Sequence, residues 1–166
     1  TLMAGETVNN IIGYTWNPKN RNLACGGSSG GEGALIGLKG SPVGFGTDIG
    51  GSIRIPAAFN GLYGIRPSSG RMPYEGMANS MDGQNSILSV VGPLGTSIGA
   101  LRLVMKTILS QQPWLHDPLV AEIPWRDEQE ARNFDSGNEE LKKVLELLRQ
   151  RLRSAAPEDA WEETRF

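Results

Sequence analysis

Two glycine-flanked serine turns, at 26–31 and 50–52, are the features of this sequence that point most directly to chemistry. A serine hydroxyl is a weak nucleophile, so acyl transfer on serine needs a base to take its proton and amide donors to hold the oxyanion. In Thr47-Asp48-Ile49-Gly50-Gly51-Ser52, two glycines allow consecutive N–H groups to converge as an anion-binding nest. Gly-Gly-Ser alone favours a tight surface turn, because these residues are common in turns. The second serine turn strengthens the catalytic interpretation.

Two long motifs, in the order found here, resemble the amidase signature family and in particular its fungal acetamidase-like members. The first is GGSSGGEGALIG at 26–37, and the second is GSPVGFGTDIGGSIRIPAAFNGLYGIRPSSG at 40–70. The resemblance covers roughly residues 1–126. It implies an α/β fold with a mixed β-sheet flanked by helices, of which this chain holds a part.

The resemblance also assigns roles at the two turns. It implies that Ser52 is the nucleophile that forms the acyl-enzyme, and that Ser28 follows a cis peptide bond and relays protons. It implies that the oxyanion hole consists of the backbone amides of Ile49, Gly50, Gly51 and Ser52. Asp48 and Arg54 carry opposite charges on either side of this turn, and we expect them to pair and to fix its ends.

The third catalytic residue of the family is a buried, neutral lysine, which lies farther upstream of the first motif than the 27 residues that precede Ser28 here. The sequence has five lysines, none of them in the family's lysine motif: Lys19, Lys39, Lys106, Lys142 and Lys143. Lys39 is expected on the surface, in a polar turn. The resemblance therefore describes an incomplete amidase, cut at both ends.

The activity that the resemblance implies is hydrolysis of a carboxamide to an acid and ammonia or an amine. The first expectation for the substrate is a small aliphatic amide, and a longer acyl amide stays open. Two alternatives also stay open. One is a catalytically silent fragment that acts as an interaction module, completed by the missing family segments or by a second copy. The other is an amidotransferase-type subunit that needs a companion.

The composition of the chain disfavours several classes of binding partner. The 166 residues carry a net charge of −2, with a pI near 5.5, which argues against nucleic acid or an anionic membrane. The sequence contains no run of 18 apolar residues, so no membrane-spanning helix is expected. The single cysteine, Cys25, is typical of a reducing compartment, and a cytoplasmic location and a packing role are expected. No cofactor is implied, and one histidine with one cysteine excludes an ordinary zinc site.

The first serine turn also fits the sequence motif of a different class of serine hydrolase. Gly26-Gly27-Ser28-Ser29-Gly30 fits G-x-S-x-G, the nucleophile elbow of an α/β-hydrolase, which requires an acid and a histidine later in the chain. Asp82 and His116 are the available partners. The elbow should follow a hydrophobic strand, and 21–25 is not hydrophobic, so this interpretation is disfavoured.

The remaining pattern predicts which elements position the turns. Asn9-Asn10 and Asn17-Pro18 are turn signals. Helices are predicted at 31–38, 57–62 and 96–109, the last with Thr96 as its cap and an apolar stripe of Ile98, Leu101, Val104, Met105 and Ile108. A buried strand is predicted from 42 to 47, extended chain at 53–55 and a break at 93–95. Residues 127–166 are predicted to form a second region, with a charged amphipathic helix at 138–153 and a disordered tail.

Overall fold

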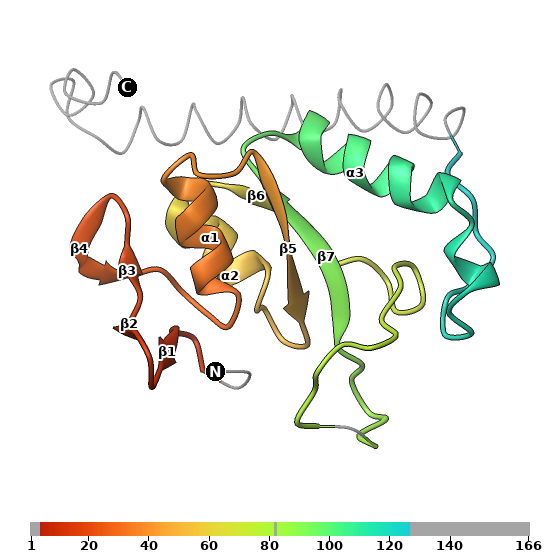
Figure 1. Ribbon diagram of the computed structural model, residues 1–166, viewed down its shortest axis with the longest axis horizontal. Helices are drawn as coiled ribbons and strands as arrows, with labels where there is room; N and C mark the ends of the chain where they lie inside the picture. The colour runs from red at the N-terminus through yellow and green to blue at the C-terminus, as the bar shows by residue number, and fades with distance from the viewer. Residues whose placement is uncertain (1–3, 82, 127–166) are drawn as a thin grey trace, which may run out of the picture. The chain divides into compact units, whose positions relative to one another are not determined.

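The computed structural model describes residues 4–81 and 83–126 (Figure 1). The chain divides into two compact units, Thr1–Trp125 and Arg126–Phe166. The described elements all belong to the first unit. The predicted helix at 138–153 and the predicted disordered tail lie outside the described residues.

Two small hairpins begin the fold. Strand β1 (Val8–Asn9) pairs antiparallel with β2 (Gly13–Tyr14), and β3 (Trp16–Asn17) pairs antiparallel with β4 (Asn20–Ala24). The first turn is held by the Asn9 side chain, whose Oδ1 accepts the amides of Ile11 and Ile12, both at 2.9 Å. Both predicted turn signals therefore fall where the chain reverses.

A three-stranded antiparallel sheet follows, in the order β5-β7-β6. Its strands are β5 (Val43–Asp48), β6 (Tyr63–Gly64) and β7 (Val90–Gly95). The register runs from Val43 opposite Gly95 to Asp48 opposite Val90. The last residue of β5, just before the Ser52 turn, therefore lies beside the first residue of β7.

The predicted break at 93–95 is wrong, because these residues lie within the central strand. Pro93 stands opposite Phe45 on β5, and on its other side its carbonyl accepts the amide of Ile65 at 3.1 Å. Proline cannot return that bond, since it has no N–H. The ladder between β6 and β7 accordingly ends at the pair Gly64–Leu94, and Pro93 is accommodated just beyond it.

Helix α1 (Gly30–Gly37) lies within one residue of its predicted position. Helix α3 (Ile98–Ser110) begins after Ser97, whose Oγ accepts the Ala100 amide at 3.1 Å. The predicted cap, Thr96, is one residue early, because its amide still donates to the Pro42 carbonyl at 3.2 Å.

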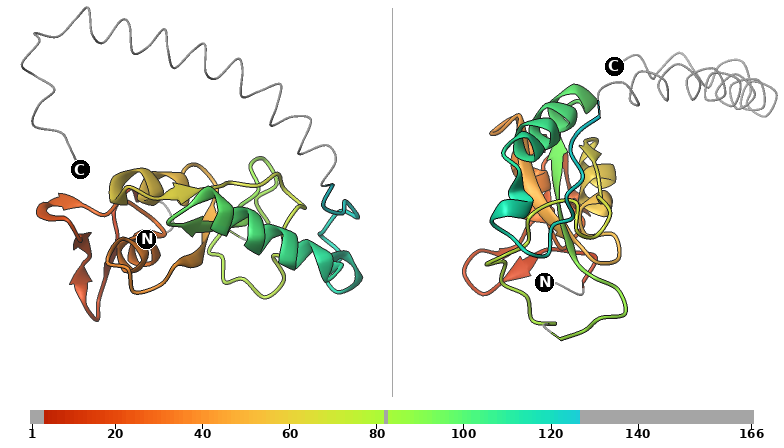
Figure 2. Two further views of the ribbon diagram at one scale, coloured as in Figure 1. Left: turned by 90° about the horizontal axis from the view of Figure 1, so that it is seen from above. Right: turned by 90° about the vertical axis from the view of Figure 1, so that its right-hand side faces the viewer.

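The apolar stripe predicted for α3 is confirmed at Leu101 and Met105, which are buried, and at Val104 and Ile108, which are half-buried, but not at Ile98. Its buried residues are Leu101, Met105 and Leu109, spaced four apart, whereas Ile98 is 64% exposed. Helix α3 packs against β7 and β6. Figure 2 shows α3 and α2 on opposite sides of the strands.

Helix α2 (Arg54–Asn60) begins earlier than the predicted 57–62, so the extended chain expected at 53–55 is wrong. Pro56 is its third residue and therefore lies in its first turn. Proline is tolerated there because the first four N–H groups of a helix have no partner within the helix. The helix ends at Asn60, since Gly61 adopts a left-handed φ of 68°, a conformation that favours glycine.

The buried core that supports the site joins both helices to the sheet. It consists of Ile36 from α1, Ile53 and Ala57 at α2, and Leu94 from β7. Burial of each large aliphatic side chain contributes about 1.5–3 kcal/mol. Because Ile53 is the residue after Ser52 and is fully buried, the core fixes one end of the nucleophile turn.

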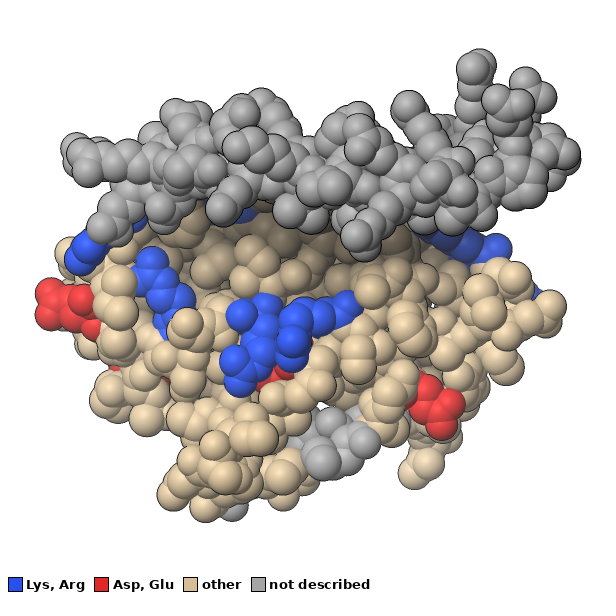
Figure 3. Space-filling view, turned by 180° about the vertical axis from the view of Figure 1, so that it is seen from behind, with Lys and Arg blue, Asp and Glu red and all other residues tan. Residues whose placement is uncertain are grey.

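No helix within the described ranges is long and apolar enough to cross a membrane. On the face opposite that of Figure 1, Lys and Arg side chains gather in one group near the middle of the described surface, and acidic atoms border it (Figure 3).

Asp117, in the segment after α3, has a buried carboxylate. Its Oδ2 accepts the amides of Tyr74 at 2.7 Å and Glu75 at 2.9 Å, and its Oδ1 accepts the amide of Leu119 at 2.8 Å. Burial would raise the pKa of this carboxyl, but the three amides outweigh it and hold the pKa below its usual value. The group therefore stabilises the fold above its unfolded pKa, and this contribution is lost as the pH falls through the lower folded pKa.

We expect Asp117→Asn to be less stable than the wild type at pH 7 by about 1–3 kcal/mol, because an amide cannot accept at both ends. Below about pH 4, where the unfolded carboxyl begins to protonate, the difference should shrink. Urea unfolding followed by circular dichroism from pH 7 to pH 2 measures it, with the exposed Glu122→Gln as control. A difference that stays constant to pH 2 would contradict the assignment.

Candidate active site

The two serine turns lie side by side. The amide of Ser29 donates to the Ser52 carbonyl at 3.2 Å, and the peptide bond between Gly27 and Ser28 is cis, as the resemblance implies. Thr7 holds the first turn from the N-terminal hairpin, because its hydroxyl donates to the Gly26 carbonyl at 3.0 Å and accepts the Gly30 amide at 3.1 Å. The turns that are 24 positions apart in the sequence are thus joined through main-chain contacts.

The two neighbouring serines of the first turn have different surroundings. Ser29 Oγ accepts the Thr47 amide at 3.2 Å and donates to the Thr47 carbonyl at 3.3 Å, which ties α1 to the end of β5. Ser28 is partly exposed beside the cavity residue Gly27. Ser29 therefore serves the fold, and Ser28 remains the candidate for proton relay.

Asp48 is the centre of the second turn. The residue is fully buried, and its carboxylate accepts the amides of Gly51 at 2.6 Å and Ile53 at 3.1 Å. The predicted ion pair with Arg54 is present: Nε lies 3.0 Å from Oδ2, and Nη2 lies 3.1 Å from Oδ1. Burial would raise the pKa of Asp48, but Arg54 and the two amides together hold it below its usual value.

This arrangement explains the early start of α2. An acceptor at the beginning of a helix satisfies amides that have no partner within the helix. Asp48 Oδ2 takes the Ile53 amide and is also 3.5 Å from the Arg54 amide. The cap comes from a residue five and six positions upstream, so short-range capping patterns do not reveal it.

The structure differs from expectation at Gly51. Its amide donates to Asp48 Oδ1 and is therefore engaged on the side of the carboxylate. Its φ of 135° is open to glycine and strained for other residues. The remaining candidates for the oxyanion hole are the amides of Ile49, Gly50 and Ser52.

A cavity of about 230 Å³ brings together three of the predicted site residues, while Ser28 and Gly51 are not among its lining residues. Ser52, which is only 9% exposed, lines it with Ile49 and Gly50. The other lining residues are Ala4, Gly5, Gly27 and Ile55. Gly27 must lack a side chain, because a Cβ there would lie 2.5–2.7 Å from main-chain atoms of Ala4 and Glu6. Thr7, Ile55 and the Ala4–Gly5 wall were not singled out from the sequence, since nothing local marks them.

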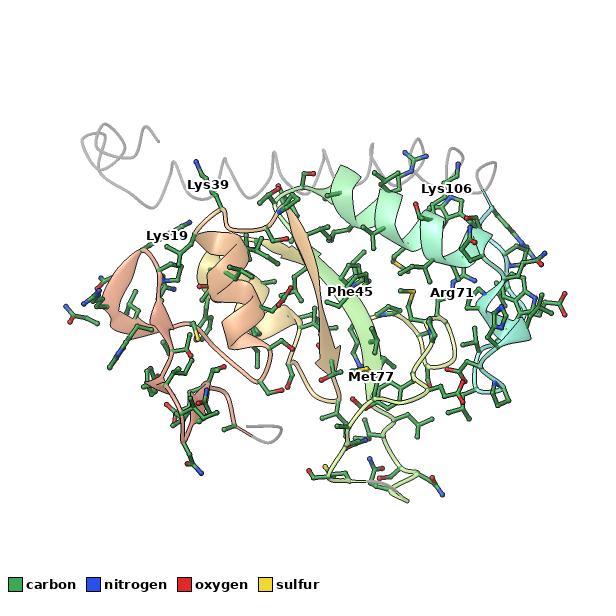
Figure 4. The ribbon with its side chains drawn as sticks, viewed as in Figure 1. Lys19, Lys39, Phe45, Arg71, Met77 and Lys106 are labelled. Carbon is green, nitrogen blue, oxygen red and sulfur yellow. The ribbon has the colours of Figure 1, made fainter. Side chains whose placement is uncertain are left out.

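The described lysines lie away from this cavity. Lys19 and Lys39 project from the outer edge of the fold near the hairpins and α1, and Lys106 projects from α3 (Figure 4). All three are exposed, as expected for Lys39. The lining residues of the cavity include no lysine.

The α/β-hydrolase interpretation gains no support from the geometry. The strand before the first serine turn, β4, pairs only with β3 and is not part of the three-stranded sheet. His116 is exposed after the short 3₁₀ helix η1 (Pro113–Leu115), and Asp82 lies outside the described residues.

Cys25 is fully buried, which raises the pKa of its thiol, and this fits the packing role expected for it. Within 4–81 and 83–126, no three His, Cys, Asp or Glu side chains gather in a group that could hold a metal ion.

Comparisons with known proteins identify the relatives of this chain. It is 62% identical over 130 residues to an acetamidase of Aspergillus oryzae, covering 78% of this chain and 24% of that protein. It is 63% identical over 126 residues to an acetamidase of Emericella nidulans, covering 76% and 23%. A solved structure of fatty acid amide hydrolase superposes with a TM-score of 0.74 at 48% identity, covering 76% of this chain and 22% of that one.

The chain spans about a quarter of the curated relatives that it matches. The family profile named Amidase matches residues 1–148, which extends past residue 126, where the resemblance was expected to end. Because this match covers 148 of the 166 residues and includes both serine turns, the chain belongs to the amidase family.

Proposed function

We propose that the protein hydrolyses a carboxamide to an acid and ammonia or an amine, with Ser52 as the nucleophile. The observation that carries this proposal is the shared cavity, in which Ser52 lies with Ile49 and Gly50 and beside the cis bond at Gly27. Backbone amides around a buried serine can stabilise the negative charge that develops on a carbonyl oxygen under attack.

In the proposed reaction, the Ser52 oxygen attacks the amide carbon, and its proton passes to Ser28 and on to the lysine that the resemblance places upstream of the first motif. The amides of Ile49, Gly50 and Ser52 hold the oxyanion. The relay returns the proton to the leaving nitrogen, the C–N bond breaks, and water then cleaves the ester between Ser52 and the acyl group.

The cavity is large enough to hold a small substrate. A water molecule occupies about 30 Å³ of liquid volume, so a cavity of about 230 Å³ has room for an amide of a few heavy atoms. Two of the relatives are named acetamidases, which agrees with this size. We therefore propose a short aliphatic amide as the substrate class.

A fluorophosphonate probe, which reacts with activated serines, tests the nucleophile. We expect one covalent adduct, mapped by peptide mass spectrometry to Ser52, in the longest chain that the reading frame around residues 1–166 encodes. Labelling should disappear in Ser52→Ala and persist in Ser110→Ala, a control at the exposed end of α3. An adduct on a different serine, or labelling that survives in Ser52→Ala, would overturn the proposal.

A further inference from the structure

Arg66 joins the nucleophile turn to a loop that lines a second cavity. Its Nε lies 3.6 Å from Asp48 Oδ1, and its Nη2 donates to the Leu88 carbonyl at 2.9 Å. We infer that Arg66 is a positioning residue, which holds the Ser52 turn in register with the loop at Leu88. This inference rests on the proposed function, because the reaction is what the positioning serves.

The contact on the Asp48 side involves the oxygen that holds the turn. Oδ1 accepts the Gly51 amide at 2.6 Å and a bond from Arg54 Nη2 at 3.1 Å, and Arg66 approaches the same oxygen. A shift of this carboxylate would move Gly51 and, with it, the neighbouring residues of the proposed oxyanion hole. A change in the position of Arg66 would therefore affect the Ser52 turn through the Asp48 carboxylate.

Charge compensation alone does not account for Arg66. Arg54 already makes a bidentate ion pair with Asp48, and such an arginine–carboxylate pair is a strong interaction. Yet the Arg66 side chain is only 26% exposed, against 53% for Arg54. Ordering a second arginine side chain costs conformational entropy, so a role besides neutralisation is indicated.

The contact on the other side places Arg66 at a cavity wall. Leu88, Ser89 and Val90 line a cavity of about 330 Å³, and Val90 is the register partner of Asp48. The loop and the nucleophile turn therefore meet at the same end of the sheet. Arg66 follows β6 and spans between them, so movement of this wall is coupled to the geometry around Ser52.

The test compares Arg66→Gln and Arg66→Lys in the longest encoded chain, with acetamide as the substrate. Misplacing a catalytic group by about 1 Å can cost up to about 100-fold in rate, so we expect Arg66→Gln to lower kcat about 10- to 100-fold with KM changed less than about threefold. Lysine keeps the charge near Asp48 and should recover part of kcat. Arg21→Gln, at an exposed position of β4, is the matched control and should keep the wild-type rate.

Amide hydrogen exchange provides a readout that does not depend on activity. Arg66→Gln should speed exchange both at Gly51 and at 88–90, and Arg21→Gln should not. Wild-type kcat and exchange in Arg66→Gln would overturn the inference, as would a kcat loss that only follows global unfolding and is not recovered by lysine. If the wild type hydrolyses no amide, the proposed function fails, while the exchange data still test the coupling.

Discussion

Replacing Ser52 by alanine is expected to lower kcat for amide hydrolysis by about 10⁴- to 10⁶-fold, the range found when a catalytic nucleophile that acts with its partners as a unit is removed. The physical reason is that no other described hydroxyl lines the cavity together with the amides of Ile49 and Gly50. Initial rates of ammonia release from acetamide, measured in the longest encoded chain, provide the test. KM should change little, because the substitution removes only the reacting hydroxyl group and leaves the other residues that line the cavity in place.

Two further variants show whether the loss belongs to chemistry. Ser28→Ala should lower kcat by about 10²- to 10⁴-fold, the usual contribution of one positioned acid–base group. Ser110→Ala should leave the rate unchanged, since its exposed hydroxyl bonds only to the Thr107 carbonyl and the Gln111 side chain, both at the end of α3. If Ser52→Ala retained more than a hundredth of the wild-type rate, another group would have to be the nucleophile.

The backbone geometry of the two serine turns could be predicted from the sequence because its determinants are local. Glycine is required where the main chain passes within van der Waals contact of another segment, as at Gly27, and where φ is positive, as at Gly51. Such positions leave a direct trace in the sequence. The Asp48–Arg54 pair was predictable for the same reason, since both residues flank the turn that they hold.

The errors arose where local structure is decided by contacts that short sequence patterns do not show. Asp48 satisfies amides at the start of α2, so the helix begins before Pro56. Pro93 lies inside β7 because β5 pairs with that strand along its whole length. The role of Arg66 depends on contacts that form only after β5, β6 and β7 have assembled. Spacing in the sequence contains no signal for these contacts.

Replacing Asp48 by alanine is expected to destabilise the chain by about 2–5 kcal/mol, because each buried main-chain amide left without an acceptor costs about 1–3 kcal/mol. The substitution leaves the Gly51 and Ile53 amides without their acceptor and leaves Arg54 and Arg66 without their common counter-charge. Arg54 is about half exposed and can be solvated, so most of the cost comes from the amides and from Arg66. Urea unfolding of the 166-residue chain, followed by circular dichroism, measures the change.

Asp48→Asn separates the charge from the acceptor. Its Oδ1 can still accept an amide, but its NH₂ group faces donors that it cannot satisfy, so we expect a loss smaller than that of alanine yet above about 1 kcal/mol. Glu122→Ala removes an exposed carboxylate and should shift the midpoint by less than about 0.5 kcal/mol. A wild-type midpoint in Asp48→Ala would mean that the core at Ile53 and Leu94 holds the nucleophile turn without the carboxylate, and Arg66 would then have no path to Ser52.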